Sequence, residues 1–212
     1  LISNSSTGST FATLSQSSSR LVNNGAGTLT ITGAVAGATS LWVGGAGNTL
    51  ISGGLGTAGI ALTKYDAGTL TLSSISNQNT ALVRINGGTL AYGVADALLT
   101  PLVTVAGGTL DLKGFNETNL STVTLIEGSI VNTGGAATLT STQQYVLESG
   151  TISVVLNSAL AAGIAKNTAG RVTLSGDNTF TSTSIAINAG YLKLAHNNAL
   201  GASGTALATT IS

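Results

Sequence analysis

The stretch Gly68-Thr69-Leu70-Thr71-Leu72 sets two leucines two residues apart behind a glycine, and this pattern recurs along the chain. Its copies begin at Gly27, Gly68, Gly88, Gly108, Gly128, Gly150, Gly170 and Gly190. From Gly68 onward, subtraction of these positions gives steps of 20, 20, 20, 22, 20 and 20 residues. Gly47 fills the gap after Gly27, with one extra residue before its leucine. A period in this range predicts a repeat architecture.

The repeating unit is predicted to contain strands, because apolar and polar residues alternate on both sides of each glycine. The run before the glycine carries the apolar pairs Val83/Ile85, Val103/Val105, Val123/Leu125, Tyr145/Leu147 and Ile185/Ile187. Glycine-rich pairs such as Asn86-Gly87 lie between the two runs and tolerate the left-handed backbone of a corner. A hairpin would not require a constant length for every unit, whereas coils stacked on one another do. The sequence therefore predicts an all-β, single-stranded parallel β-helix, or β-solenoid, of about ten coils with roughly 20 residues each, as one domain over residues 1–212.

Stacked coils bring like side chains into columns. The expected inward column is Leu29, Leu50, Leu70, Leu90, Leu110, Ile130, Ile152, Val172 and Leu192. None of these residues is polar, as expected if a polar side chain there would bury an unsatisfied group. Tyr92 and Tyr145 also fall on inward positions and are expected to fill the core or its corners. At the usual strand spacing, ten coils make a rod about 50 Å long.

The composition excludes several classes of protein. The 212 residues have a formal net charge of zero, and only 7% of them are charged, which argues against a nucleic-acid partner. No apolar run is long enough for a transmembrane helix. The absence of cysteine excludes disulfides and thiolate metal sites. The chain does not begin with Met and shows no signal peptide, so we expect an excised or processed piece.

Residues 60–73, which include Leu62-Thr63-Lys64 and Gly68-Thr69-Leu70-Thr71-Leu72-Ser73, resemble the passenger-associated repeat of bacterial autotransporters. A second copy runs from Ile164 through Leu174-Ser175-Gly176 to Asn198-Ala199-Leu200-Gly201. Lys64 and Lys166 fit the lysine of the repeat, and Asn24 stands in its place in a weaker copy over residues 21–57. The resemblance covers roughly residues 60–99 and 164–204 and is faint over 102–160. One family repeat covers two coils.

The resemblance implies a right-handed parallel β-helix exported to the bacterial cell surface. It implies no single activity, because passengers of this kind include adhesins, aggregation factors and stalks that carry enzymes. The main hypothesis is a non-enzymatic extracellular rod for adhesion or display, associated with the outer membrane through a region outside this chain. Its partners would be other surface proteins or glycans, or the chain itself. The alternative is a subunit of a fibre or surface layer, since residues 1–6 and 206–212 offer no cap for an open sheet edge.

An enzyme on a β-helix would need convergent carboxylates on adjacent coils. Glu127 and Glu148 come nearest to this, but two solvated turn carboxylates are the favoured interpretation. His196, the only histidine, is expected in an exposed loop rather than as a catalytic base. We therefore predict no catalytic residues, no cofactor and no metal site.

The residues proposed for surface contacts are Trp42, Thr28, Thr30, Thr69 and Thr71. The threonines would line an outer face, and regular threonine arrays on β-solenoids can bind ice. Here the rows are interrupted, and threonine suits exposed strand positions in any case. Ice binding and polysaccharide activity therefore remain minor alternatives. For Trp42, an exposed sugar- or protein-contact position and a buried position are both open.

Overall fold

The computed structural model describes residues 1–15, 19–37, 39–56, 59–75, 81–99, 101–158, 163–180, 184–201 and 208–211, with only the backbone of Ser19, Ser184 and 208–211. Thr57 and residues 206, 207 and 212, which belong to expectations stated above, lie outside these ranges. Every strand pairing in the described part is parallel, and twenty strands join in one sheet. The described residues contain no helix long and apolar enough to cross a membrane.

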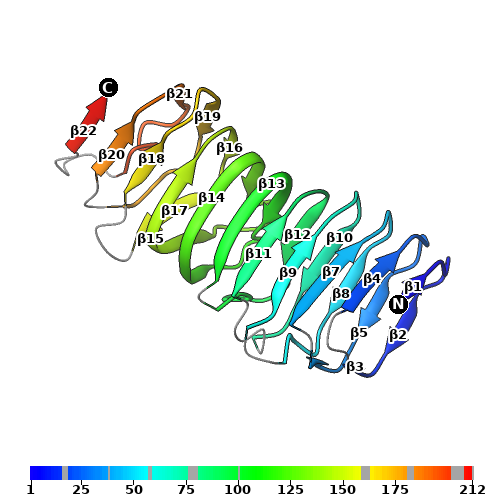
Figure 1. Ribbon diagram of the computed structural model, residues 1–212. Coiled ribbons are helices and arrows are strands. Elements are labelled where there is room, and N and C mark those ends of the chain that lie inside the picture. The colour runs from blue at the N-terminus through cyan, green and yellow to red at the C-terminus, as the bar shows by residue number, and fades with distance from the viewer. Residues whose placement is uncertain are drawn as a thin grey trace.

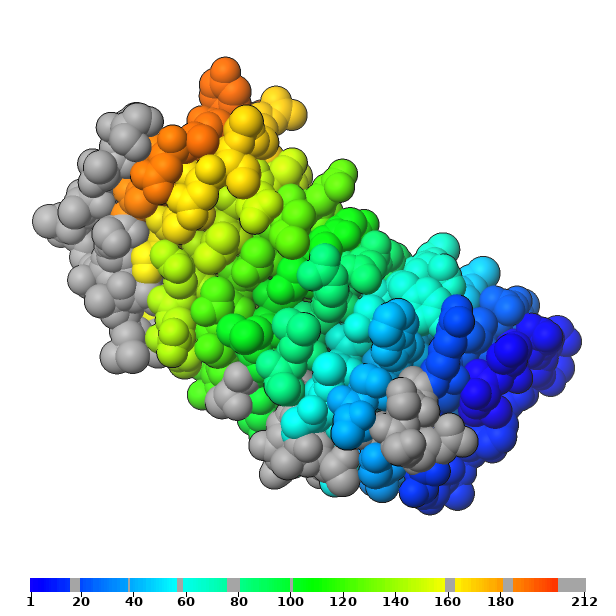
Figure 2. Space-filling view, viewed as in Figure 1, coloured from blue at the N-terminus to red at the C-terminus, as the bar shows by residue number. Residues whose placement is uncertain are grey.

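The strands stack along an elongated body, and successive coils follow one another from one end to the other (Figures 1 and 2). The first ladder runs along the face that Figure 1 shows most fully. Its strands, in order, are β1 (Ile2–Ser3), β4 (Ser19–Asn23), β7 (Ser40–Gly44), β9 (Ala61–Lys64), β11 (Leu82–Ile85), β13 (Leu102–Asp111), β14 (Glu117–Val131), β15 (Thr138–Leu147), β18 (Ile164–Lys166), β20 (Ser184–Ile187) and β22 (Ala208–Ile211).

The second ladder holds the strands that follow the repeated glycines. It consists of β2 (Ser9–Phe11), β5 (Leu29–Ile31), β8 (Thr49–Ile51), β10 (Thr69–Leu72), β12 (Thr89–Tyr92), the later parts of β13 and β14, β16 (Gly150–Ile152), β19 (Arg171–Leu174) and β21 (Tyr191–Leu194). These ten successive rungs agree with the predicted number of coils. They confirm the parallel β-solenoid and exclude the hairpin arrangement.

A third, interrupted ladder closes the cross-section. At one end β3 (Leu14–Ser15) pairs with β6 (Val35–Ala36), and Val35 also bridges to Leu55. Further along, the beginning of β14 pairs with the beginning of β15, which in turn pairs with β17 (Val155–Ser158). Each coil thus contributes up to three short strands joined by corners.

The core is the set of columns that these ladders turn inward. In the first ladder, one column is Leu41, Leu62, Val83, Val103, Val123, Tyr145, Ile164 and Ile185, all of them buried. Tyr92 and Tyr145 are also buried, as predicted. The Tyr145 hydroxyl donates to the carbonyl of Leu139 and lies 2.5 Å from the Asn157 carbonyl, and it accepts from the Ser141 N–H. This tyrosine therefore fastens a corner through its polar end.

The predicted inward column of the second ladder is displaced at three rungs, β8, β19 and β21. In β8 the extra residue before Leu50 shifts the register, so that Thr49 lies between Leu29 and Leu70 and Leu50 lies between Thr30 and Thr71. Thr49 is buried and its Oγ1 has no hydrogen-bond partner, whereas Leu50 is half-buried. A polar residue therefore does occur in this column, contrary to expectation.

The other displaced rungs are β19 and β21, where Leu192 pairs with Val172 and is only half-buried. Ile152 pairs with Leu174, and Val172 pairs with Gly150. Val172 is still buried, because a shift by two residues keeps each side chain on the same face of the sheet. The 22-residue separation of Ile152 and Leu174 replaces the 20-residue step that the glycines suggest.

Candidate functional site

An aromatic and basic cluster lies on the outer face of the first ladder. Arg20 and Trp42 are directly opposite one another on β4 and β7, and Tyr65 follows β9. The Trp42 and Tyr65 rings meet edge to face, with centroids 6.4 Å apart and planes at 68°. The Arg20 Nε donates to the Tyr65 hydroxyl over 2.5 Å, and its guanidinium carbon is 5.1 Å from the ring centroid. Three consecutive coils thus hold one another's side chains in place.

Gly44 makes room for this arrangement. A Cβ atom placed on Gly44 would lie 2.3 Å from Cε2 of Tyr65, so the tyrosine ring covers the glycine of the preceding coil. Trp42 itself is 50% exposed, which resolves the choice left open by the sequence. The sequence analysis missed Arg20, Tyr65 and Gly44 as members of this cluster, because only the register between coils brings them together.

The predicted threonine face is divided between two columns. Thr28 is exposed, whereas Thr30, Thr69 and Thr71 are half-buried. Thr30 and Thr71 share a column in which Leu50 lies between them, and the column continues from Thr71 to Ala91 and Asp111. A neighbouring column is an unbroken run of hydroxyl residues: Thr69, Thr89, Thr109, Ser129, Thr151 and Thr173. The outer face therefore offers a single hydroxyl row beside an irregular one.

Two lysines occupy the apolar interior at equivalent places. Lys64 lies in the column between Val43 and Ile85, and Lys166 lies in the same column between Leu147 and Ile187. Both side chains are buried. The Lys64 Nζ donates to the carbonyl oxygens of Tyr65, Asp66 and Gly87 at 2.6, 2.8 and 3.3 Å. These carbonyl oxygens satisfy an ammonium group that would otherwise be isolated.

The second lysine has a smaller set of partners. Lys166 donates to the backbone oxygen of Thr168 and, at 3.3 Å, to its hydroxyl. Burial lowers the pKa of Lys64 to about 8, opposed by the nearby Asp66 carboxylate. Burial also lowers the pKa of Lys166, opposed by Glu148. Both lysines therefore act as internal cross-links of a turn.

In the weaker first copy, it is Asn23, rather than Asn24, whose side chain bonds to backbone groups of the adjacent turn. Asn24 is exposed, whereas Asn23 is buried. The Asn23 side-chain amide donates to the carbonyls of Gly27 and Asn48 at 2.8 and 2.6 Å and accepts from the Gly25 N–H. The column of Lys64 continues through Val43 to Leu21, so neither asparagine lies at the position of the lysine in the strand register.

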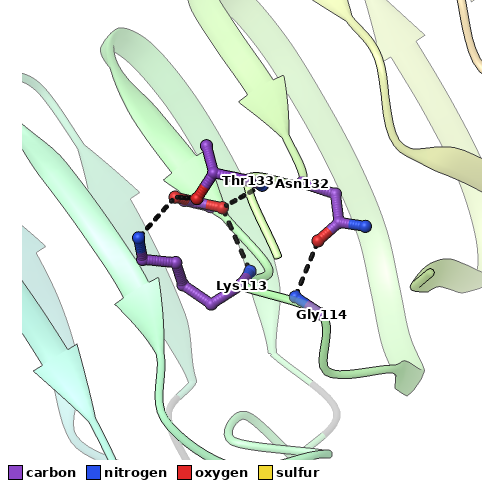
Figure 3. A network of polar contacts seen from close by, with 5 residues as sticks. Lys113, Gly114, Asn132 and Thr133 are labelled. Carbon is purple, nitrogen blue, oxygen red and sulfur yellow. Dashed lines mark hydrogen bonds and ion pairs between the residues drawn. The ribbon is translucent and has the colours of Figure 1, made fainter. Parts of the chain in front are cut away.

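A second polar network fastens the corner after the second ladder (Figure 3). Asp111 Oδ1 accepts from the backbone N–H groups of Lys113 and Thr133, and its Oδ2 accepts from the Thr133 hydroxyl over 2.6 Å. The Lys113 ammonium lies 3.7 Å from Oδ2, and Asn132 accepts from the Gly114 N–H. Burial alone would raise the pKa of Asp111, but these hydrogen bonds and Lys113 together lower it. The carboxylate is thus used to close a corner.

Glu117 is the fourth buried charged residue. It faces inward from the start of β14, opposite Leu139. Its Oε2 accepts from the Tyr92 hydroxyl at 2.9 Å and from the Leu98 N–H, and its Oε1 accepts from the Asn119 N–H. Burial raises the pKa of Glu117 to about 7, against the opposing effect of these hydrogen bonds. Burial and the adjacent Glu117 also raise the pKa of Tyr92.

The remaining candidates for chemistry are dispersed. Glu127 is exposed and Glu148 is half-buried, and no described contact joins their carboxylates. His196 is exposed in a turn, where its Nδ1 accepts from the Asn198 N–H and lies 3.8 Å from Asp177 Oδ1. Within the described ranges, no group of three or more His, Cys, Asp or Glu side chains gathers in one place.

Comparison with known protein families gives one match. The passenger-associated transport repeat matches residues 62–91 and 165–194. The chain carries two copies of this repeat. No curated protein and no solved structure matches the chain significantly.

Each passenger-associated transport repeat coincides with two rungs of the solenoid. The first copy spans β9 to β12, and the second spans β18 to β21. Both copies begin beside a buried lysine, Lys64 or Lys166, and end on a strand of the second ladder. The repeat therefore describes a scaffold unit of the rod, and the Arg20–Trp42–Tyr65 cluster lies mostly outside it.

Proposed function

We propose that this chain is a non-enzymatic, passenger-type rod that acts in adhesion or display on a bacterial surface. The observation that carries the proposal is the coincidence of both repeat copies with complete coils of a parallel solenoid. Buried charged groups, such as those of Lys64, Asp111 and Glu117, are bonded to the backbone of corners and turns. Because these groups stabilise corners and turns, they suit a scaffold that acts through its length and its lateral faces.

The test is to display the chain on a non-adherent bacterium through an outer-membrane anchor. Cells that display it should attach to host cells or to an extracellular matrix more strongly than cells that carry the anchor alone. The matched control is the displayed Leu110→Asp variant, in which a buried residue of the second ladder becomes charged. Equal attachment by cells with the chain, with the unfolded variant and with the anchor alone would contradict an adhesive role.

End-to-end assembly is the second candidate. β1 pairs with β4 alone, and Leu1 and Ile2 are exposed beside a cavity of about 360 Å³ that Arg20 and Val22 also line. A second copy could continue the ladder at this edge. Sedimentation that depends on concentration would support assembly, and a single monomeric species up to high concentration would reject it.

A further inference from the structure

The outer face of the first ladder between β4 and β13 carries two arginines, Arg20 and Arg84, and the acidic Glu127 lies at its edge, opposite Ala106. The outward column through Trp42 holds Arg20, Thr63 and Arg84, and the exposed Leu82 and Leu102 form a neighbouring pair on β11 and β13. Arg20 and Arg84 are the charged members of this set, and neither makes an ion pair within the described residues. Asp66, in the turn after Tyr65, accepts from the Gly45 N–H through its carboxylate. The face is therefore suited to an anion.

Trp42 provides an apolar platform in the middle of this face. It lies in one column with Arg20, Thr63 and Arg84. Half of its surface is exposed, and no described residue accepts a hydrogen bond from its indole N–H. Tyr65, which Arg20 and the space over Gly44 hold in place, supports the edge of the indole ring. An exposed, pre-oriented aromatic ring with a free donor favours stacking on a ligand that is both apolar and polar.

We propose that this face binds an acidic polysaccharide, with a sugar ring stacked on Trp42 and a uronate carboxylate paired with Arg20. Arg84 is three strands away from Arg20, or about 14 Å at the usual strand spacing, and meets a second carboxylate further along the same polymer. Most other outward side chains near Trp42 are small or carry hydroxyl groups. The exposed apolar pair Leu82 and Leu102 lies on β11 and β13, apart from Trp42 on β7, so the surroundings of Trp42 do not form the broad apolar centre of a protein interface. The inference rests on the proposed adhesive function and names the substrate class that the rod would hold.

The first experiment uses tetragalacturonic acid and the fluorescence of the purified chain. Trp42 is the only tryptophan, so the emission reports on the proposed contact itself. We expect a saturable change in emission that weakens as salt is added. The fully methyl-esterified tetramer, which lacks the negative charge, should bind at least tenfold more weakly. No saturable change, or equal affinity for both tetramers, would overturn the proposal.

Variants locate the binding site by calorimetry. Trp42→Ala and Arg20→Gln should each weaken tetragalacturonate at least tenfold, and Arg20→Gln should also reduce the salt dependence. Gly44→Ala should weaken binding through the displaced Tyr65 ring. Arg171 and Tyr191 face each other on β19 and β21, without a described side-chain contact between them. Arg171→Gln and Tyr191→Ala are therefore the matched controls and should bind like the unmodified chain.

Four results would contradict this assignment. Unchanged affinity in Trp42→Ala and Arg20→Gln, with melting temperatures like that of the unmodified chain, would remove the site from this face. An equal loss in the Arg171 and Tyr191 controls would do the same. Competition by polyglutamate as strong as that by galacturonate would assign the face to an acidic polypeptide. If the purified chain fails to bind while displaying cells still adhere, this inference fails and the proposed function stands.

Discussion

The coils that begin the two repeat copies and the coils between them fill the same inward column with different kinds of side chain. In the inward column of the first ladder, the copies place Lys64 and Lys166, whereas the coils between them place Ile85, Val105, Leu125 and Leu147. All six side chains are buried. The lysines fit because each ammonium group reaches carbonyl oxygens at the adjacent turn. The comparison teaches that a rung accepts a polar side chain when the turn supplies its partners.

The largest expected effect comes from a charge without such partners. Leu110 is fully buried between Leu90 and Ile130. Leu110→Asp should lower the free energy of unfolding by at least about 4 kcal/mol, because the carboxylate would be buried without a donor. Thr109→Asp, one residue away on the outer face, should cost about 1 kcal/mol or less. Thermal melts of the two variants check this, and equal melting temperatures would contradict the assigned faces.

Glu117 is a buried charged side chain in the coils between the two repeat copies. Its raised pKa should make the stability of the chain depend on pH, and this is the second largest expected effect. The folded pKa of about 7 lies above the ordinary value of 4.5, so the folded state binds more protons than the unfolded state between these values. Stability should therefore be greatest at acidic pH and fall by up to about 3 kcal/mol as the pH rises from 4.5 through 7. Urea titrations of the chain and of Glu117→Gln at pH 5 and pH 8 measure it. An unmodified chain no less stable at pH 8 than at pH 5 would refute the role given to burial.

The two lysines should differ from one another. Lys64→Met should cost about 2 kcal/mol, because three carbonyl oxygens lose their donor and one of them, Gly87, belongs to the next coil. Lys166→Met should cost about 1 kcal/mol, because its described partners are both atoms of Thr168. Chemical denaturation of both variants makes the comparison. A gain in stability in both would show that these rungs prefer an apolar residue.

Thr49 should give the smallest effect, and of the opposite sign. Its buried Oγ1 lacks a hydrogen-bond partner, so Thr49→Val should stabilise the chain by about 1 kcal/mol. Val replaces the hydroxyl by a methyl group of similar volume. Thr69→Val, on the half-buried outer column, is the control and should change stability little. A loss of stability in Thr49→Val would mean that the hydroxyl has a partner after all.

Much of the fold was predictable because glycine corners and alternating strands repeat at a nearly fixed length. The pairs Val83/Ile85 and Val103/Val105 and the two core tyrosines lie where the pattern predicts. The displaced rungs at Thr49 and Leu174 were not predictable from the glycines, because an inserted residue can be absorbed on either side of a corner. The register of the neighbouring strand decides between these choices.

The candidate site was predictable only in part. Trp42 stands out because it is the one tryptophan among few aromatic residues. Its partners Arg20 and Tyr65 lie 22 and 23 residues away from it, and their contact depends on the exact register and on the missing side chain of Gly44. The burial of Glu117 could not be predicted from the sequence either, because a carboxylate at the start of a strand is usually exposed. Its partners Tyr92 and Leu98 come from the preceding coil.

The most direct test of the stacked rod measures distances along one outer column. Thr63, Thr104 and Ala186 share this column, and the chain has no cysteine, so spin labels can be attached at cysteines introduced in pairs. Six rungs separate Thr63 from Ala186 and four separate Thr104 from Ala186. Pulsed electron resonance should therefore give mean distances of about 29 Å and about 19 Å, before the label's own length is added. Distances that do not grow with the number of rungs between the labels would contradict the solenoid and the surface rod built on it.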